Sequence, residues 1–158
     1  MTGLHISLLA PDAALFAPFG KFISPPDADG QRRFYSEQLH DRPSASAPVL
    51  HTNHVAPKSL PATIDQMERH PHAAQTFVPM DVSRYVVVVT PTGEDGAPLC
   101  DQALGFEMPG SLGVIYHPGV WHMGAMVLDR AGHFAVLMWR GGPLPDDEFR
   151  TISPITIG

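Results

Sequence analysis

Short apolar runs separated by glycine and proline dominate the chain from residue 49 onward. The clearest is RYVVVVTP at 84–91, where four consecutive valines are ended by Pro91. A β-branched run of this kind is typical of a buried strand. Glycine and proline separate most of the other short segments that favour strands, and their regular spacing predicts an all-β barrel or sandwich. These further strands are expected within 49–56, 62–70, 74–80, 103–106, 113–117, 121–128 and 133–139.

The N-terminal third has a weaker pattern. Residues 4–10 (LHISLLA) predict a short strand, and Asp12 is a good N-cap for one helical turn over 13–16. Residues 24–33 (SPPDADGQRR) form a loop by composition, and residues 25–48 as a whole give no clear structural signal. We find no internal repeat, heptad pattern or linker, so a single domain over residues 1–158 is expected.

The composition indicates which kinds of partner and which cellular compartment to expect. The chain has 10 Lys+Arg against 16 Asp+Glu, a formal charge of −6, which argues against nucleic acid as a partner because phosphate binding needs a clustered basic face. Cys100 is the single cysteine, so a reducing compartment is expected. There is no basic leader followed by an apolar run, and no stretch approaches the roughly 20 apolar residues of a membrane span. These features predict a cytoplasmic protein without a membrane partner.

The histidines carry the strongest chemical signal. Residues two apart on a strand share a face, so Glu68 and His70 are expected to point into the same space. Gln75 can return to that space on the adjoining strand, and His122 follows the turn at Pro118–Gly119. A mixed oxygen and nitrogen set of this kind can hold a divalent metal ion. The alternative is that Glu68 and His70 are an ordinary surface pair, because Glu-x-His is common on strands.

This layout resembles the cupin barrel, in which a same-face pair, a third ligand and a distant histidine meet inside a small barrel. A narrower resemblance is to the ureidoglycolate lyase family, formerly called ureidoglycolate hydrolases. It extends from about residue 12 to residue 142. The resemblance implies a cupin-type double-stranded β-helix barrel, a homodimer and a possible nickel dependence. It also implies release of urea and glyoxylate from the small substrate ureidoglycolate in allantoin breakdown. The segments that carry it are FAPFGKFI (16–23), MERHPHAAQTFVPM (67–80), YVVVVTP (85–91) and GVIYHPGVWH (113–122).

On this resemblance, Glu68, His70 and His122 are the expected catalytic residues, and together with Gln75 they are the expected metal ligands. Gln75 is also assigned to substrate binding. Arg140 would pair with the substrate carboxylate, with a structural ion pair as its alternative role. Tyr116 would donate a hydrogen bond, with a core or rim position as its alternative. The remaining aromatic candidates, Trp121 and Phe134, are expected in the core.

Several positions depart from the family pattern. Met123–Gly124 stand where the family usually has His-Pro, and Trp139 replaces the acid of an Asp-Arg-Gly-Gly run. His54 replaces a basic residue, and His72 stands at a position that is often apolar. The alternative function is therefore a divergent cupin that acts on, or only binds, another small carboxylate. A metal-dependent oxygenase or isomerase is a further enzyme class, although it would prefer three histidines and a glutamate.

Overall fold

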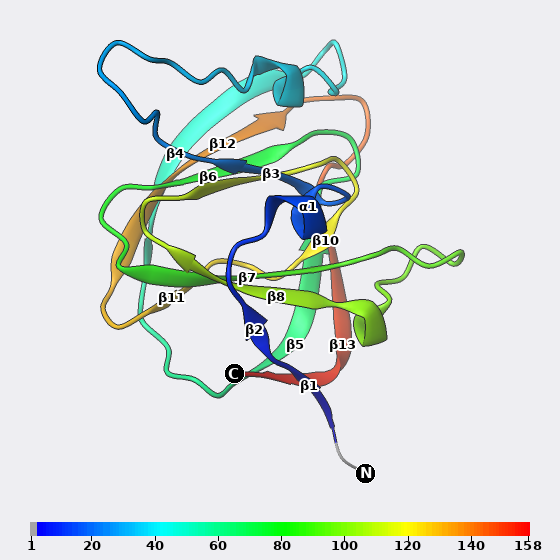
Figure 1. Ribbon diagram of the computed structural model, residues 1–158. Coiled ribbons are helices and arrows are strands. Elements are labelled where there is room, and N and C mark those ends of the chain that lie inside the picture. Colours follow the sequence, from blue (N-terminus) through cyan, green and yellow to red (C-terminus); the bar gives the residue numbers. More distant parts are fainter. Residues whose placement is uncertain (1–2) are drawn as a thin grey trace.

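Two β-sheets face each other in the computed structural model, which describes residues 3–158 (Figure 1). The larger sheet has the order β1-β13-β5-β10-β7-β8-β2, with β11 also paired to β7. The smaller sheet has the order β3-β9-β6-β12-β4. Antiparallel pairing joins strands that are far apart in the chain, such as β5 with β13 and β4 with β12. This confirms the all-β, cupin-type barrel expected from the sequence.

The strands of the larger sheet are β1 (Leu4–Ile6), β2 (Leu8–Leu9), β5 (Ala62–Arg69), β7 (Arg84–Thr90), β8 (Leu104–Pro109), β10 (Trp121–His122), β11 (Met126–Leu128) and β13 (Glu148–Ile157). Those of the smaller sheet are β3 (Gly20–Ile23), β4 (Ala47–Val55), β6 (Gln75–Pro79), β9 (Gly113–Tyr116) and β12 (Gly132–Arg140). The helical segments are α1 (Ala13–Phe16) and the single 3₁₀ turns η1 (Ser36–Leu39) and η2 (Cys100–Gln102).

The four valines of β7 are buried because this strand has a core on both faces. Val87 and Val89 point into the cluster between the two sheets, together with Phe106 and Phe134. Val86 and Val88 point into a second cluster on the other face of the larger sheet. A strand covered on both sides needs no polar alternation, which explains the uninterrupted apolar run in the sequence.

The short N-terminal helix forms as the sequence predicts. Asp12 Oδ1 accepts hydrogen bonds from the backbone N–H groups of Ala14 and Leu15 at 2.9 and 3.0 Å. These two donors would otherwise be unsatisfied at the start of α1. The helix places Phe16 in the core, where its ring stacks on Phe22 with the centroids 4.5 Å apart.

The expected strand over 121–128 is broken into β10 and β11. Residues 123–125 separate these two pieces, whereas only Val87 and Val88 separate their partners on β7. One extra residue therefore forms a β-bulge, which reverses the side-chain alternation along the strand. His122 faces the space between the sheets, while Met126, on the other side of the bulge, packs in the second cluster.

Two strands were not foreseen. β3 pairs with β9, and β13 pairs with β5 over most of its length. The segment 25–48, which gave no clear signal, contains η1 and the first residues of β4. Among residues 3–158, no helix is long and apolar enough to cross a membrane.

Candidate functional site

Glu68 and His122 form a cross-strand pair in the larger sheet. Glu68 lies next to the end of β5 and is in direct register with His122 of β10. Glu68 Oε1 lies 3.4 Å from His122 Nε2. The His122 side chain is only 1% exposed and that of Glu68 is 19% exposed, so the pair is closed on the histidine side and open on the carboxylate side.

His70 joins this pair from the residue that follows the end of β5. Its ring is buried, and its centroid lies 5.8 Å from that of His122. The His70 carbonyl accepts a hydrogen bond of 2.8 Å from the Gly119 N–H. Gly119 has a φ of +78°, a conformation that glycine adopts without strain. The Pro118–Gly119 turn thus ties the approach to β10 directly to His70.

Gln75 approaches from the opposite sheet, not from the adjoining strand as the sequence suggested. It begins β6, which pairs with β9 and β12 in the smaller sheet and has no pairing with β5. Its Oε1 lies 3.1 Å from His122 Nε2. Closure of the barrel brings the start of β6 over the end of β5, so Gln75 reaches the same space across the interior.

The donor atoms of Glu68, His70 and His122 lie within 4.8 Å of one another. This spacing is suitable for a single bound cation. With Gln75 Oε1 the set has two imidazole nitrogens, one carboxylate oxygen and one amide oxygen. Imidazole suits zinc, copper, iron and nickel, and oxygen ligands extend the range toward harder divalent ions.

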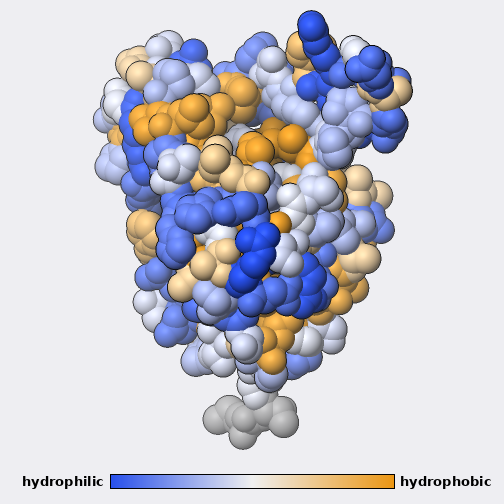
Figure 2. Space-filling model, turned by 90° about the vertical axis from the view of Figure 1, so that its left-hand side faces the viewer, coloured by the Kyte–Doolittle hydropathy of each residue, from blue (hydrophilic) through white to orange (hydrophobic). Residues whose placement is uncertain are grey.

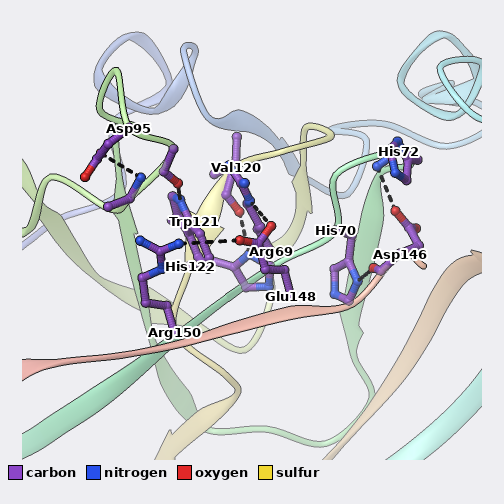
Figure 3. Close-up of polar contacts among 12 residues, drawn as sticks. Arg69, His70, His72, Asp95, Val120, Trp121, His122, Asp146, Glu148 and Arg150 are labelled. Carbon is purple, nitrogen blue, oxygen red and sulfur yellow. Dashed lines mark hydrogen bonds and ion pairs between the residues drawn. The ribbon is translucent and has the colours of Figure 1, made fainter. Parts of the chain in front are cut away.

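The other ring nitrogens orient both histidines toward this point. His70 Nδ1–H donates to the Asp146 carbonyl at 2.7 Å and lies 3.1 Å from Asp147 Oδ1. His122 Nδ1–H donates to the Val120 carbonyl at 3.0 Å. Figure 3 shows His70 and His72 beside Asp146, whose carboxylate also accepts the His72 N–H. Such contacts fix the tautomer in which Nε2 carries the lone pair, as in the outer shell of metal-binding histidines.

The resulting arrangement needs a positive charge at its centre. With Nδ1 protonated, His122 Nε2 faces the oxygens of Gln75 and Glu68 with a lone pair, and lone pairs repel each other. His70 Nε2 is buried and has no hydrogen-bond partner among residues 3–158. A proton on an imidazole or a bound metal ion would satisfy these atoms, and the metal would satisfy all of them together. The residues therefore fit a divalent metal ion.

Glu68 is held in its ionised form. Burial alone would raise the pKa of its carboxyl group, but a second proton on His122 Nε2, which then donates to the carboxylate, and the positive charges of His122 and His70 outweigh burial. The pKa of Glu68 is therefore lowered from its usual value. A carboxylate that stays ionised in acid is suited to bind a cation or to accept a proton transiently.

Tyr116 takes a core position beneath the cluster. Its ring stacks on His122 with the centroids 4.0 Å apart and an interplanar angle of 11°. Burial, with smaller contributions from Tyr85 and Glu68, raises the pKa of Tyr116 well above its usual value. The phenol is therefore neutral, and its ring restrains the His122 imidazole.

Arg140 lies at the end of β12 and pairs with Asp147, with its Nη1 2.7 Å from Asp147 Oδ2. The same carboxylate reaches His70 through its other oxygen. Arg140, Asp146 and Asp147 line a surface groove of about 480 Å³ together with Trp139 and Leu144. The groove thus begins where the ligand cluster is anchored.

The aspartates of this groove were missed in the sequence. Asp146 and Asp147 precede β13, and their only signal is the acidic run PDDEF at 145–149. Trp139 lies on the opposite face of β12 from Arg140, beneath the Arg42 guanidinium at 4.0 Å from its ring centroid. The acid that the family usually has at position 139 is therefore absent here. Asp147 supplies a carboxylate beside Arg140 instead.

The two-residue departure at Met123–Gly124 does lie at the site. A Cβ atom on Gly124 would stand 3.8 Å from Glu68 Oε1. Met123 is buried in the second cluster. The bulge thus leaves open space next to Glu68, which is partly exposed, whereas the other three candidate ligands are buried.

A barrel of two sheets with buried imidazole and carboxylate groups between them defines a cupin-type protein with a candidate metal centre. The family model described as ureidoglycolate lyase matches residues 1–156, and the chain belongs to the ureidoglycolate lyase family.

Curated relatives agree with this assignment. The chain is similar to ureidoglycolate lyase of Burkholderia cepacia, with 37% identity over 83% of this chain and 77% of the relative. It is also similar to those of Azotobacter vinelandii (34%, 86% of each chain) and Stutzerimonas stutzeri (31%, 94% of this chain and 90% of the relative). These relatives support the assignment of this chain to the lyases. Among solved structures, RmlC from Streptococcus suis matches with a TM-score of 0.42 and 11% identity over 63% of this chain and 46% of that chain.

Proposed function

We propose that this protein cleaves ureidoglycolate to glyoxylate and urea. The observation that carries the proposal is the convergence of Glu68, His70 and His122 within 4.8 Å, with both Nδ1–H groups directed away from the centre. Family membership supports the choice of substrate. The finer class is a carbon–nitrogen lyase acting on a ureido group.

The reaction breaks one bond and moves one proton. Ureidoglycolate carries a hydroxyl, a carboxylate and the ureido nitrogen on a single carbon. Removal of the hydroxyl proton forms the aldehyde C=O bond as the C–N bond breaks. The electron pair of that bond goes to nitrogen, which takes up a proton and leaves as urea. No water is consumed.

In this proposal His70, His122, Gln75 and Glu68 hold a divalent metal ion. When bound, the ion supplies a Lewis acid that lowers the pKa of the substrate hydroxyl. Nickel is the metal that we propose, since the mixed nitrogen and oxygen set suits it. The two backbone carbonyls and Asp147 keep both imidazoles oriented for this task.

Glu68 is the side chain that we assign to the proton transfer. It is the most exposed member of the cluster, and its lowered pKa keeps it ionised at neutral pH. Once protonated, it is a strong enough acid to return the proton to the departing nitrogen. Arg140 lines the groove whose Asp147 contacts His70, and it would receive the substrate carboxylate by exchanging its contact with Asp147.

A direct assay tests the function. Purified protein is incubated with each enantiomer of ureidoglycolate, and urea and glyoxylate are measured together, before and after chelation and again after Ni²⁺ is restored. We expect equimolar products that fall on chelation and return with the metal. Equimolar products that are insensitive to chelation would contradict the metal assignment alone, whereas no products with either enantiomer would contradict the function.

A second function is favoured by the bulge. Met123–Gly124 stand where the family usually has His-Pro, and a Cβ atom on Gly124 would lie 3.8 Å from Glu68 Oε1. A cupin that binds another small carboxylate would use the same Arg140 and the same cluster without cleaving ureidoglycolate. The assay above separates the two, because a non-catalytic protein would release neither product while still binding the metal.

We further propose a homodimer of single-domain subunits working in the cytoplasm on a small molecule, without a nucleic acid partner. Hydrophobic residues reach the surface in patches bordered by hydrophilic ones (Figure 2). Leu50 is 73% exposed and is in register with Leu137 on the outward-facing side of β4 and β12. An apolar sheet face of this kind favours association with a second copy.

A further inference from the structure

A second group of histidines lies on the outside of the smaller sheet, away from the barrel interior. His54 of β4 and His133 of β12 are direct cross-strand partners, and these two strands run side by side (Figure 1). His54 Nδ1 lies 3.0 Å from His133 Nε2, and the ring centroids are 4.9 Å apart. His133 alternates with the buried Phe134, so its ring stands on the outer face.

Asp81 fixes the orientation of His133 from the turn after β6. Its Oδ2 accepts the His133 Nδ1–H at 2.8 Å, and its Oδ1 accepts the His133 backbone N–H at 2.7 Å. The hydrogen bond with His133 lowers the pKa of Asp81, so the carboxylate is ionised. The other nitrogen of His133, Nε2, therefore presents its lone pair to His54.

We propose that His54 and His133 form a surface binding site for a divalent transition metal ion, with Asp81 as the outer carboxylate that orients His133. Two imidazole nitrogens bound to one zinc ion at about 2.0–2.1 Å are about 3.3 Å apart in tetrahedral geometry. The observed separation of 3.0 Å lies within a few tenths of an ångström of this value, so a small movement of the two rings admits the ion. The metal takes the place of the single proton shared by the two nitrogens, and water completes its coordination.

The chemistry of the three residues supports this assignment. Neutral imidazole binds zinc, copper and nickel, and a metal-bound histidine typically donates its other N–H to a carboxylate. Both side chains of the His133–Asp81 pair are nearly half exposed, so an ion can enter from solvent. The site does not depend on the function proposed above, because it shares no residue with the interior cluster.

The position in the sheet gives the site a structural consequence. β4 is the last strand in the order of the smaller sheet and pairs with β12 alone among the described strands. A metal that joins His54 to His133 ties this edge strand to its neighbour. Binding to the folded state only would raise the melting temperature with metal concentration.

Calorimetric titration with Zn²⁺ tests the proposal. The wild-type protein is compared with His54→Ala, His133→Ala and the matched control His51→Ala, an exposed histidine elsewhere on β4. We expect His54→Ala and His133→Ala to bind one Zn²⁺ ion fewer than wild type, and His51→Ala to bind the same number. Equal numbers in wild type and His54→Ala would overturn the site.

Two further measurements keep the test independent of folding and of the interior cluster. Asp81→Asn should weaken Zn²⁺ binding at this site by about 10–100-fold and leave the number of sites unchanged. The loss of one ion in His54→Ala should recur when His70→Ala is also present. Asp81→Asn with unchanged affinity, or no loss in the combined variant, would contradict the proposal. Circular dichroism checks that every variant is folded.

Discussion

The two buried imidazoles of the interior cluster are oriented by contacts on their outer edges. His70 is held by Asp146 and Asp147, and His122 is held by the Val120 carbonyl and by stacking on Tyr116. These contacts fix which nitrogen carries the lone pair before any ligand arrives. The site is therefore preorganised, because little side-chain entropy remains to be lost on binding.

His70→Ala and His122→Ala should each lower urea release from ureidoglycolate by at least 100-fold without unfolding the protein. Each change removes one donor from the polar cluster and leaves the apolar clusters of the barrel intact. Urea release at saturating substrate is the measurement, with circular dichroism as the check of fold. His51→Ala is the matched control and should keep full activity. Full activity in both cluster variants would show that these residues do not carry the reaction.

Asp147 is expected to act through His70. Asp147→Ala should weaken binding of the interior metal by about 10–100-fold, the usual effect of losing an outer-shell partner. Metal affinity is measured by competition with a chelator, and Asp147→Asn, which keeps one oxygen, should recover part of it. Asp65→Ala, at an exposed position on β5, is the control. An affinity equal to that of wild type would assign Asp147 to the Arg140 ion pair alone.

The lowered pKa of Glu68 predicts how stability depends on pH. The carboxyl has a lower pKa in the folded protein than in the unfolded chain, where it is about 4.3. The carboxylate therefore stabilises the fold fully above that value, and this contribution is lost as the pH falls toward the folded pKa. Urea unfolding of wild type and Glu68→Gln measures the difference.

The advantage of wild type over Glu68→Gln should shrink in acid below about pH 4. The measurements are made on metal-free protein, so that metal release does not add to the change. A difference that grows as the pH falls would mean that Glu68 has a raised pKa in the folded state.

At the scale of elements, β7 and its neighbours determine how the site is built. The strand supplies apolar side chains to both cores, and its pairing with β10 and β11 contains the bulge that turns His122 toward the barrel interior. The bulge interrupts the backbone pairing with β7 between β10 and β11. Its effect is that His122 faces the interior cluster although Met126, four residues further along, packs in the second cluster on the other face.

Phe106→Ala should lower the free energy of unfolding by about 3–5 kcal/mol. Phe106 of β8 is fully buried, and its ring meets Phe16 edge-on with the centroids 5.8 Å apart. The change therefore leaves a cavity between α1 and the larger sheet. Denaturant unfolding measures the loss, and the matched control Phe34→Ala, at a position that is 76% exposed, should change stability by less than about 0.5 kcal/mol. Equal effects of the two changes would contradict this packing.

For the whole molecule, the homodimer is testable by mass. The subunit is 17.1 kDa, so sedimentation equilibrium at micromolar concentration should give about twice that value. Leu50→Asp, which places a charge on the outer face of the smaller sheet, should shift the mass toward that of one subunit without loss of β structure. A mass near 17.1 kDa for wild type would reject the dimer.

The sequence alone determined the fold class and most of the members of the site. The valines of β7, the Asp12 cap and the glycine and proline breaks are local signals, since each depends on the conformation of a few neighbouring residues. The same is true of the Glu68–His70 spacing at the end of β5. These features can be predicted from the sequence because strand alternation and turn geometry are properties of short segments.

Only the tertiary structure decided how the site is closed. It placed Gln75 on the opposite sheet and added Asp146 and Asp147 beside His70. It also paired His54 with His133, which lie 79 residues apart in the chain. These contacts depend on strand order and register, and register is fixed by the burial of whole faces and by the bulge rather than by any local pattern.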